Sequence, residues 1–101
     1  MKSEDVLSAE QRARGARVLQ ALANPLRLGI MQALAEKPLT CSELQALLEC
    51  PQPTLSLQLK QLVDQGLVDT CKEGMVKRCS IRNRDFLKLF TCLRRHLLEV
   101  L

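Results

Sequence analysis

Hydrophobic residues recur every three or four positions over most of this chain, which is the spacing of helices that bury one face. The first such stretch opens with a capping-box pattern, Ser8 with Gln11, and predicts a helix that runs to about Leu22. In the second stretch, Asn24 is a favourable N-cap and Pro25 a favourable first helical residue. A second helix is therefore predicted, and we expect it to end before the next proline.

Two shorter helices separated by a tight turn are predicted in the middle of the chain. Thr40 and Glu43 form a second capping box, which starts a helix that ends near Cys50-Pro51. The next helix has Pro53 in its first turn and ends at Gly66, a residue suited to the left-handed position after a helix. The apolar stripe of this helix, which we expect to be buried, is Leu55, Leu59, Leu62 and Val63.

A β-hairpin and a last helix complete the pattern. Residues 67–71 and 76–81 read as two strands joined by a turn near Glu73-Gly74. Asn83 is a further N-cap and starts a helix that reaches the C-terminus. The apolar residues of this helix have the spacing of a coiled-coil seam: Phe86, Phe90, Leu93, Leu97 and Val100. Because so small a chain has little core, we expect this helix and the first helix to form a homodimer with a second copy.

Composition agrees with one domain over residues 1–101. Hydrophobic residues make up 47% of the chain and aromatic residues only 2%, so an aliphatic, helical core is favoured over a sandwich or barrel. No stretch is apolar for long enough to cross a membrane, and the polar first residues do not resemble a secretory signal. We therefore expect a soluble, cytoplasmic protein. Its net charge of +4 suits a polyanionic partner without requiring one.

The order of elements from residue 40 to residue 81 is that of a winged helix-turn-helix, with the helix after Pro51 as recognition helix. The predicted fold class is therefore mainly α with a small β-hairpin wing and five helices. Side chains that can pair with base edges occupy outward positions of the recognition helix: Gln52, Thr54, Ser56 and Gln58. Phosphate contacts are predicted for Lys60, Lys72, Lys77 and Arg78. The alternative is that these residues form an ordinary solvated surface, with charges that keep an exposed strand from aggregating.

Three stretches of the chain resemble the ArsR/SmtB family of dimeric winged-helix repressors. VLQALANPLRLGIMQAL is similar to the family's second helix, CSELQALLECPQPTLSLQLKQLVDQGLV to its helix-turn-helix, and KEGMVKRCSI to its wing. The resemblance implies a repressor that binds a partly palindromic double-stranded DNA operator and changes affinity when an inducer binds. The chain departs from the family at Pro51, where a capping serine is usual, and at Leu57, where a polar or basic residue is common.

The resemblance leaves the inducer open. The family's thiol-rich metal and metalloid site has two cysteines near the start of its third helix, whereas this chain has only Cys41 there. The family's zinc site between the C-terminal helices aligns with Asn83, Asp85, His96 and Glu99. Three of these can bind zinc, whereas Asn83 is a poor ligand. The alternative is that His96 and Glu99 form an ordinary polar pair on an exposed helix.

Thiol chemistry is a further hypothesis for the inducer site. The five cysteines are odd in number and lack the spacing of a disulfide framework. Cys92 lies close in sequence to two arginines, a setting that favours reactive thiols. We hypothesise that at least one pair of cysteines, involving Cys50 or Cys92, forms a thiol-dependent switch. For each cysteine, buried packing is the alternative.

Two other classes of function compete with a DNA-binding repressor. A winged-helix module can bind a protein partner instead of DNA, but it would expose a larger apolar patch on the recognition helix than Leu57 alone. An enzyme is disfavoured because the one histidine lies in the last helix, and neither a nucleophile with a base nor a phosphate-binding glycine loop is visible.

Overall fold

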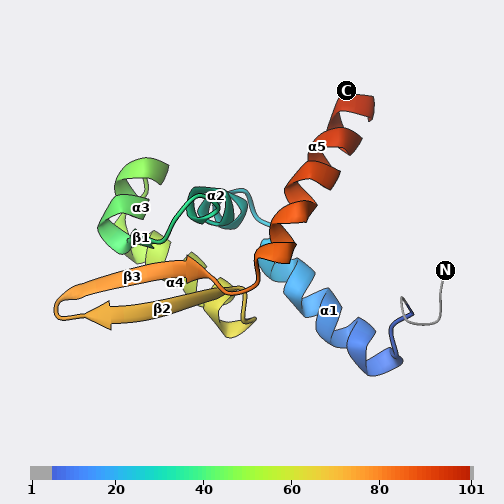
Figure 1. Ribbon diagram of the computed structural model, residues 1–101, viewed down its shortest axis with the longest axis horizontal. Coiled ribbons are helices and arrows are strands. Elements are labelled where there is room, and N and C mark those ends of the chain that lie inside the picture. Colours follow the sequence, from blue (N-terminus) through green and yellow to red (C-terminus); the bar gives the residue numbers. More distant parts are fainter. Residues whose placement is uncertain (1–5, 101) are drawn as a thin grey trace.

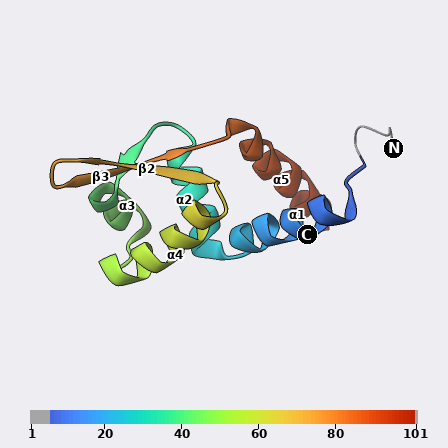
Figure 2. The same ribbon diagram turned by 90° about the horizontal axis from the view of Figure 1, so that it is seen from below.

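The structure, a computed structural model that describes residues 6–100, contains the predicted elements in the predicted order (Figure 1). They are α1 (Ala9–Leu22), α2 (Pro25–Leu34), β1 (Leu39–Thr40), α3 (Cys41–Leu48), α4 (Gln52–Asp64), β2 (Val68–Glu73), β3 (Val76–Ile81), the 3₁₀ helix η2 (Arg84–Leu87) and α5 (Lys88–Val100). The β2–β3 hairpin lies at one end of the long axis, and α1 and α5 lie at the other (Figures 1 and 2). The predicted fold, five helices with a winged helix-turn-helix, is confirmed.

Side-chain caps fix three of the helix starts, as the sequence predicted. The Ser8 hydroxyl accepts from the backbone of Gln11, whose side chain accepts from the backbone of Ser8. The amide oxygen of Asn24 caps α2, and Thr40 forms a reciprocal capping box with Glu43 at the start of α3. The backbone and side-chain hydrogen bonds from Thr40 lower the pKa of Glu43. These caps set where each helix begins, because they satisfy backbone N–H groups that have no partner within the helix.

The wing turn lies one residue later than predicted. Glu73 belongs to β2 and pairs with Val76, so the two-residue turn is Gly74-Met75 rather than Glu73-Gly74. Gly74 takes a φ of 63°, a left-handed conformation that glycine adopts without strain. The first position of the turn is where a type II′ hairpin places its glycine, and this requirement sets the register.

A third strand, which no local sequence pattern predicts, widens the hairpin into a sheet of order β1-β3-β2. β1 is only two residues long, and its Leu39 pairs with Cys79 while Thr40 pairs with Arg78. The strand therefore connects the residues just before α3 to the base of the wing.

The last α-helix starts later than predicted. Asn83 caps a turn, as expected, but that turn is the 3₁₀ helix η2, and α5 begins at Lys88. The first two members of the predicted apolar seam, Phe86 and Phe90, are partly buried against the core. From Leu93 onward the seam is exposed within one chain, with 42% of Leu93 and 49% of Leu97 accessible.

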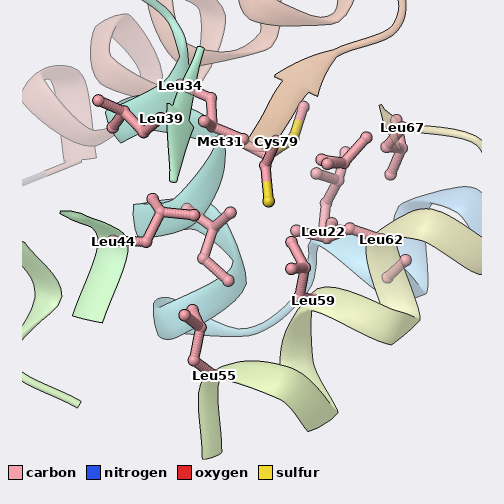
Figure 3. Close-up of a cluster of buried hydrophobic side chains, with 13 residues drawn as sticks. Leu22, Met31, Leu34, Leu39, Leu44, Leu55, Leu59, Leu62, Leu67 and Cys79 are labelled. Carbon is pink, nitrogen blue, oxygen red and sulfur yellow. The ribbon is translucent and has the colours of Figure 1, made fainter. Parts of the chain in front are cut away.

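The hydrophobic core lies between α2, the helix-turn-helix pair α3 and α4, and the base of the sheet (Figure 3). Leu55, Leu59 and Leu62 of the predicted α4 stripe are buried, whereas Val63 is half-buried. Gly66 follows α4 with a φ of 72°, as its predicted role at the helix end requires. None of the helices within residues 6–100 is both long and apolar enough to span a bilayer.

Two leucines of α4 allow the importance of this core to be measured. Leu62 is 0% exposed and Leu57 is 59% exposed. Leu62→Ala should lower the free energy of unfolding by about 2–5 kcal/mol, because it removes apolar contacts and leaves a cavity. Leu57→Ala should change it by less than about 0.5 kcal/mol. Urea denaturation followed by circular dichroism measures both values, and equal losses would contradict the described orientation of α4.

Candidate nucleic-acid interface

The buried stripe of α4 packs towards α2, α3 and β2, which leaves the opposite side of the helix in solvent. Gln52, Thr54 and Ser56 are exposed in the first two turns. Gln52 Nε2 donates to Ser56 Oγ at 2.7 Å, so these two side chains lie side by side. The structure therefore brings several of the predicted base-reading residues onto one accessible surface.

Gln58, also predicted to read bases, is held by a residue of α2. Arg27 Nη1 donates to Gln58 Oε1 at 2.5 Å, and Gln58 is half-buried. Because an arginine side chain can only donate, Gln58 must turn its oxygen towards Arg27, and the amide NH₂ keeps both donors for another partner. Sequence reasoning missed this contact because Arg27 and Gln58 are 31 residues apart.

Arg27 also contacts the end of α1. Its Nε donates to the backbone oxygen of Ala21 at 2.6 Å and its Nη2 to that of Gln20 at 3.3 Å. Carbonyl groups in the last turn of a helix lack partners within the helix, and basic side chains commonly satisfy them. One side chain therefore joins the end of α1 to α2 and to the exposed part of α4.

The wing carries three basic side chains, Lys72, Lys77 and Arg78. Lys72 and Lys77 are exposed and stand directly opposite each other in the β2–β3 register. Neither lysine takes part in an ion pair among residues 6–100, the part of the chain that is described. Like charges placed opposite each other destabilise a sheet, so this arrangement favours an anionic partner.

The other two predicted phosphate contacts are engaged in exposed ion pairs. Lys60 Nζ lies 2.9 Å from Asp64 Oδ2, and Arg78 Nε lies 3.7 Å from Glu73 Oε1. Exposed pairs of this kind contribute about 0–1 kcal/mol to stability. Both cations can therefore exchange their carboxylate partner for a phosphate at little cost.

The predicted zinc ligands do not meet within one chain. Asp85 lies in η2, where it pairs with Lys88 Nζ at 3.4 Å. His96 and Glu99 line a shallow hollow on α5 that also includes Cys92. Residues 6–100 contain no group of three or more His, Cys, Asp or Glu side chains that could hold a metal ion. A site that bridges two copies of α5 stays a prediction.

The cysteine pair that the structure brings together was not predicted. All five cysteines are free, Cys92 is exposed on α5, and Cys50 is half-buried after α3. The sulfur atoms of Cys41 and Cys79 lie 3.9 Å apart. These residues are 38 positions apart in sequence, and they meet only because β1 pairs with β3. No local pattern could have revealed that pairing.

Burial determines the chemistry of Cys79. Loss of solvation, followed by the proximity of Cys41, raises the pKa of the Cys79 thiol to about 12. The thiol therefore stays protonated at neutral pH, and the thiolate is the reactive form of cysteine.

Alkylation by iodoacetamide at pH 7 should consequently label Cys79 last in the native protein, while the exposed Cys71 and Cys92 react early. Mass spectrometry of peptides after timed quenching measures the order. Labelling in urea is the control and should make all five thiols react at similar rates. Native labelling of Cys79 as fast as Cys71 would show that Cys79 is not buried.

Known proteins share both the sequence and the fold. A family described as a helix-turn-helix domain matches residues 22–71. A transcriptional repressor SmtB homolog from Synechocystis is 32% identical over 95 residues, which cover 94% of this chain and 72% of the relative. The biofilm growth-associated repressor of Agrobacterium fabrum is 44% identical over 57 residues. That match covers 56% of this chain and 49% of the relative, so it spans about half of the relative's length.

A solved structure extends the likeness over nearly the whole fold. The solution structure of a homodimeric winged helix-turn-helix DNA-binding domain from Mycobacterium bovis, from a possible ArsR-family regulator, gives a TM-score of 0.77 with 28% identity. The match covers 94% of this chain and 91% of that chain. The resemblance found in the sequence is thus confirmed by a relative matched over most of its length and by the fold. This chain belongs to the ArsR/SmtB family of winged helix-turn-helix transcriptional repressors.

Proposed function

We propose that the protein is a cytoplasmic, homodimeric repressor that binds a partly palindromic double-stranded DNA operator and is switched by a small inducer. The observation that carries this proposal is the pair of facing lysines, Lys72 and Lys77, on a wing that accompanies the polar exposed surface of α4. A DNA backbone supplies a row of negatively charged phosphates, with which these two lysines can pair. The relatives of this chain are transcriptional repressors, a class of proteins without enzymatic activity.

In the proposed complex, α4 enters the major groove. Gln52, Thr54, Ser56 and the NH₂ group of Gln58 contact base edges, for which short hydroxyl and amide side chains are suited. Lys60, Lys72, Lys77 and Arg78 contact phosphates, which fixes the orientation of the protein without specifying sequence. The rival role, a winged helix that binds a protein, is disfavoured because Leu57 is the one large apolar side chain exposed on α4.

A second copy would cover the apolar side of α1 and α5. Leu19 of α1 and Leu93 and Leu97 of α5 are large exposed hydrophobic residues within one chain. Between α1, α2 and α5 lies an apolar hollow of 270 Å³, lined by residues that include Leu19, Phe90 and Leu93. The M. bovis relative is homodimeric. We infer that the same two helices form the dimer here, which would place two copies of α4 about 34 Å apart in successive major grooves.

The inducer site rests on fewer observations. Zinc held between two copies of α5 by Asp85, His96 and Glu99 would require a second chain, since these residues do not meet in one. A thiol-dependent switch at Cys50 or Cys92 would require a partner thiol, and of these two residues Cys92 is exposed whereas Cys50 is half-buried. His96, Glu99 and Cys92 all lie on α5, so a site that includes these residues would act on the dimer geometry.

Fluorescence anisotropy tests the proposal as a whole. The reduced, metal-free protein should bind DNA from upstream of its own gene more tightly than a scrambled duplex. The logarithm of affinity should fall with the logarithm of salt concentration, with a slope of about −0.9 for each phosphate neutralised. Three outcomes would contradict the proposal and favour a protein partner: equal affinity for the two duplexes, an affinity that does not depend on salt, or no binding to either duplex.

Two substitutions separate base reading from phosphate contact. Gln58→Ala should reduce discrimination between operator variants by about 1–3 kcal/mol, whereas Lys77→Ala should weaken all sequences alike and lower the salt slope by about 1. Lys37→Ala, an exposed lysine outside the wing and α4, is the matched control and should change neither value. Identical effects of Gln58→Ala and Lys77→Ala would refute the division of roles. If Gln58→Ala lowers the thermal stability but leaves the discrimination between operator variants unchanged, Gln58 serves only the contact with Arg27.

A further inference from the structure

Arg27 of α2 is held at the junction of three helices. Its Nε donates to the backbone oxygen of Ala21 at 2.6 Å and its Nη2 to that of Gln20 at 3.3 Å, both near the end of α1. Its Nη1 donates to Gln58 Oε1 of α4 at 2.5 Å. The helices α1, α2 and α4 pack against one another in this part of the molecule (Figure 2). Three hydrogen bonds to two other helices therefore fix the guanidinium beside the amide of Gln58.

The positive charge of Arg27 is not neutralised by a carboxylate. Its three partners are neutral oxygen atoms, and within residues 6–100 it takes part in no ion pair. Arg27 is half-buried, so ions in solution screen its charge less than they screen an exposed charge. A hydrogen bond to the oxygen of an amide polarises the amide, which makes its NH₂ group a stronger donor.

Gln58 lies at the border between the buried and the exposed side of α4. It precedes Leu59, which is buried, and follows Thr54 by one helical turn. Residues four apart lie on the same face of a helix, so Gln58 is a neighbour of Thr54, an exposed residue that is proposed to contact bases. The Gln58 oxygen is turned towards α2, and the contact with Arg27 leaves both NH₂ donors available.

We propose that Arg27 makes Gln58 select guanine instead of adenine, an inference that rests on the proposed repressor function. A glutamine amide without such a neighbour pairs with adenine, because its NH₂ group donates to N7 while its oxygen accepts from the N6 amino group. In this chain the oxygen already accepts from Arg27. An amide oxygen has a second lone pair, but an amino group that approaches it would meet the positive charge of the guanidinium.

Guanine presents the edge that fits a group with donors alone. Its O6 and N7 atoms are both acceptors in the major groove, and the Gln58 NH₂ group has two donors. Thymine presents one acceptor beside a methyl group, and cytosine presents a donor. Arg27 acts on the base through Gln58, so it is a positioning residue that determines specificity.

Single base-pair variants of the operator identify the base that Gln58 reads. Each duplex is titrated by fluorescence anisotropy with the wild-type protein and with Gln58→Ala. The position at which Gln58→Ala loses discrimination is the position that Gln58 contacts. There the wild-type protein should bind guanine more tightly than adenine, by about 5–150-fold, which is the discrimination that one good base contact provides.

Substitution of Arg27 tests the cause of this preference. Arg27→Met removes the donors and the charge, so the Gln58 oxygen can accept from adenine and the preference should shift from guanine to adenine. Arg27→Gln should act in the same direction, because its amide is uncharged and can accept as well as donate. Arg84→Met is the matched control and should leave the preference unchanged. Arg84 is exposed and also donates to a backbone oxygen at a helix end, that of Ala35.

Nuclear magnetic resonance tests the contact without DNA. In ¹H–¹⁵N spectra of the free protein, both Arg27 variants should shift the side-chain amide resonances of Gln58, whereas Arg84→Met should leave them in place. Circular dichroism and a thermal melt show which variants are folded. Arg27→Gln retains a donor for the carbonyl groups of α1, so it decides the test if Arg27→Met does not fold.

Four results would overturn the inference and leave the repressor proposal standing, provided that the wild-type protein discriminates between duplexes. These are a preference for a base other than guanine at the Gln58 position, a guanine preference that survives in a folded Arg27 variant, an equal loss of this preference in Arg84→Met, or discrimination that nowhere depends on Gln58. If no duplex is preferred, the repressor proposal itself is overturned and the inference with it. The resonances of Gln58 then still show whether Arg27 holds its amide.

Discussion

Burial of one leucine stripe on α4 fixes the orientation on which the functional surface depends. Leu55, Leu59 and Leu62 are almost completely buried against a core that also contains Ile30 and Met31 of α2. Full burial of a leucine side chain contributes about 1.5–3 kcal/mol relative to exposure. A rotation of α4 about its axis would therefore be costly. Because a helix has a fixed period, burial of this stripe places the polar side chains of α4 on the outside.

Hydrogen bonds and strand pairing connect α4, whose orientation the buried leucines determine, and the wing to the rest of the molecule. Arg27 reaches the last carbonyls of α1 and the amide of Gln58, so it links the helix proposed for dimerisation to the helix proposed for DNA reading. At the other side of the helix-turn-helix, β1 joins the start of α3 to the wing. A change at either end of the molecule thus has a short physical route to α4 or to the wing. A response to an inducer requires a coupling free energy between the inducer site and the DNA-binding surface.

Local signals in the sequence predicted much of the fold. The caps at Ser8, Asn24 and Thr40 and the α4 leucines each depend on residues within a few positions, and they were placed correctly. The missed features depend on distant residues: the pairing of β1 with β3, the contact of Arg27 with Gln58, and the approach of Cys41 to Cys79. Tertiary packing alone determines such pairings. The polar residues of α4 could be identified from the sequence, but their individual hydrogen-bond partners could not.

A hydroxyl-radical footprint on DNA from upstream of the protein's own gene tests the central claim most directly. A dimer that places two copies of α4 in successive major grooves should protect two segments related by an approximate dyad, with centres about 34 Å apart along the duplex. A single protected segment, or protection spread evenly along the duplex, would contradict the account.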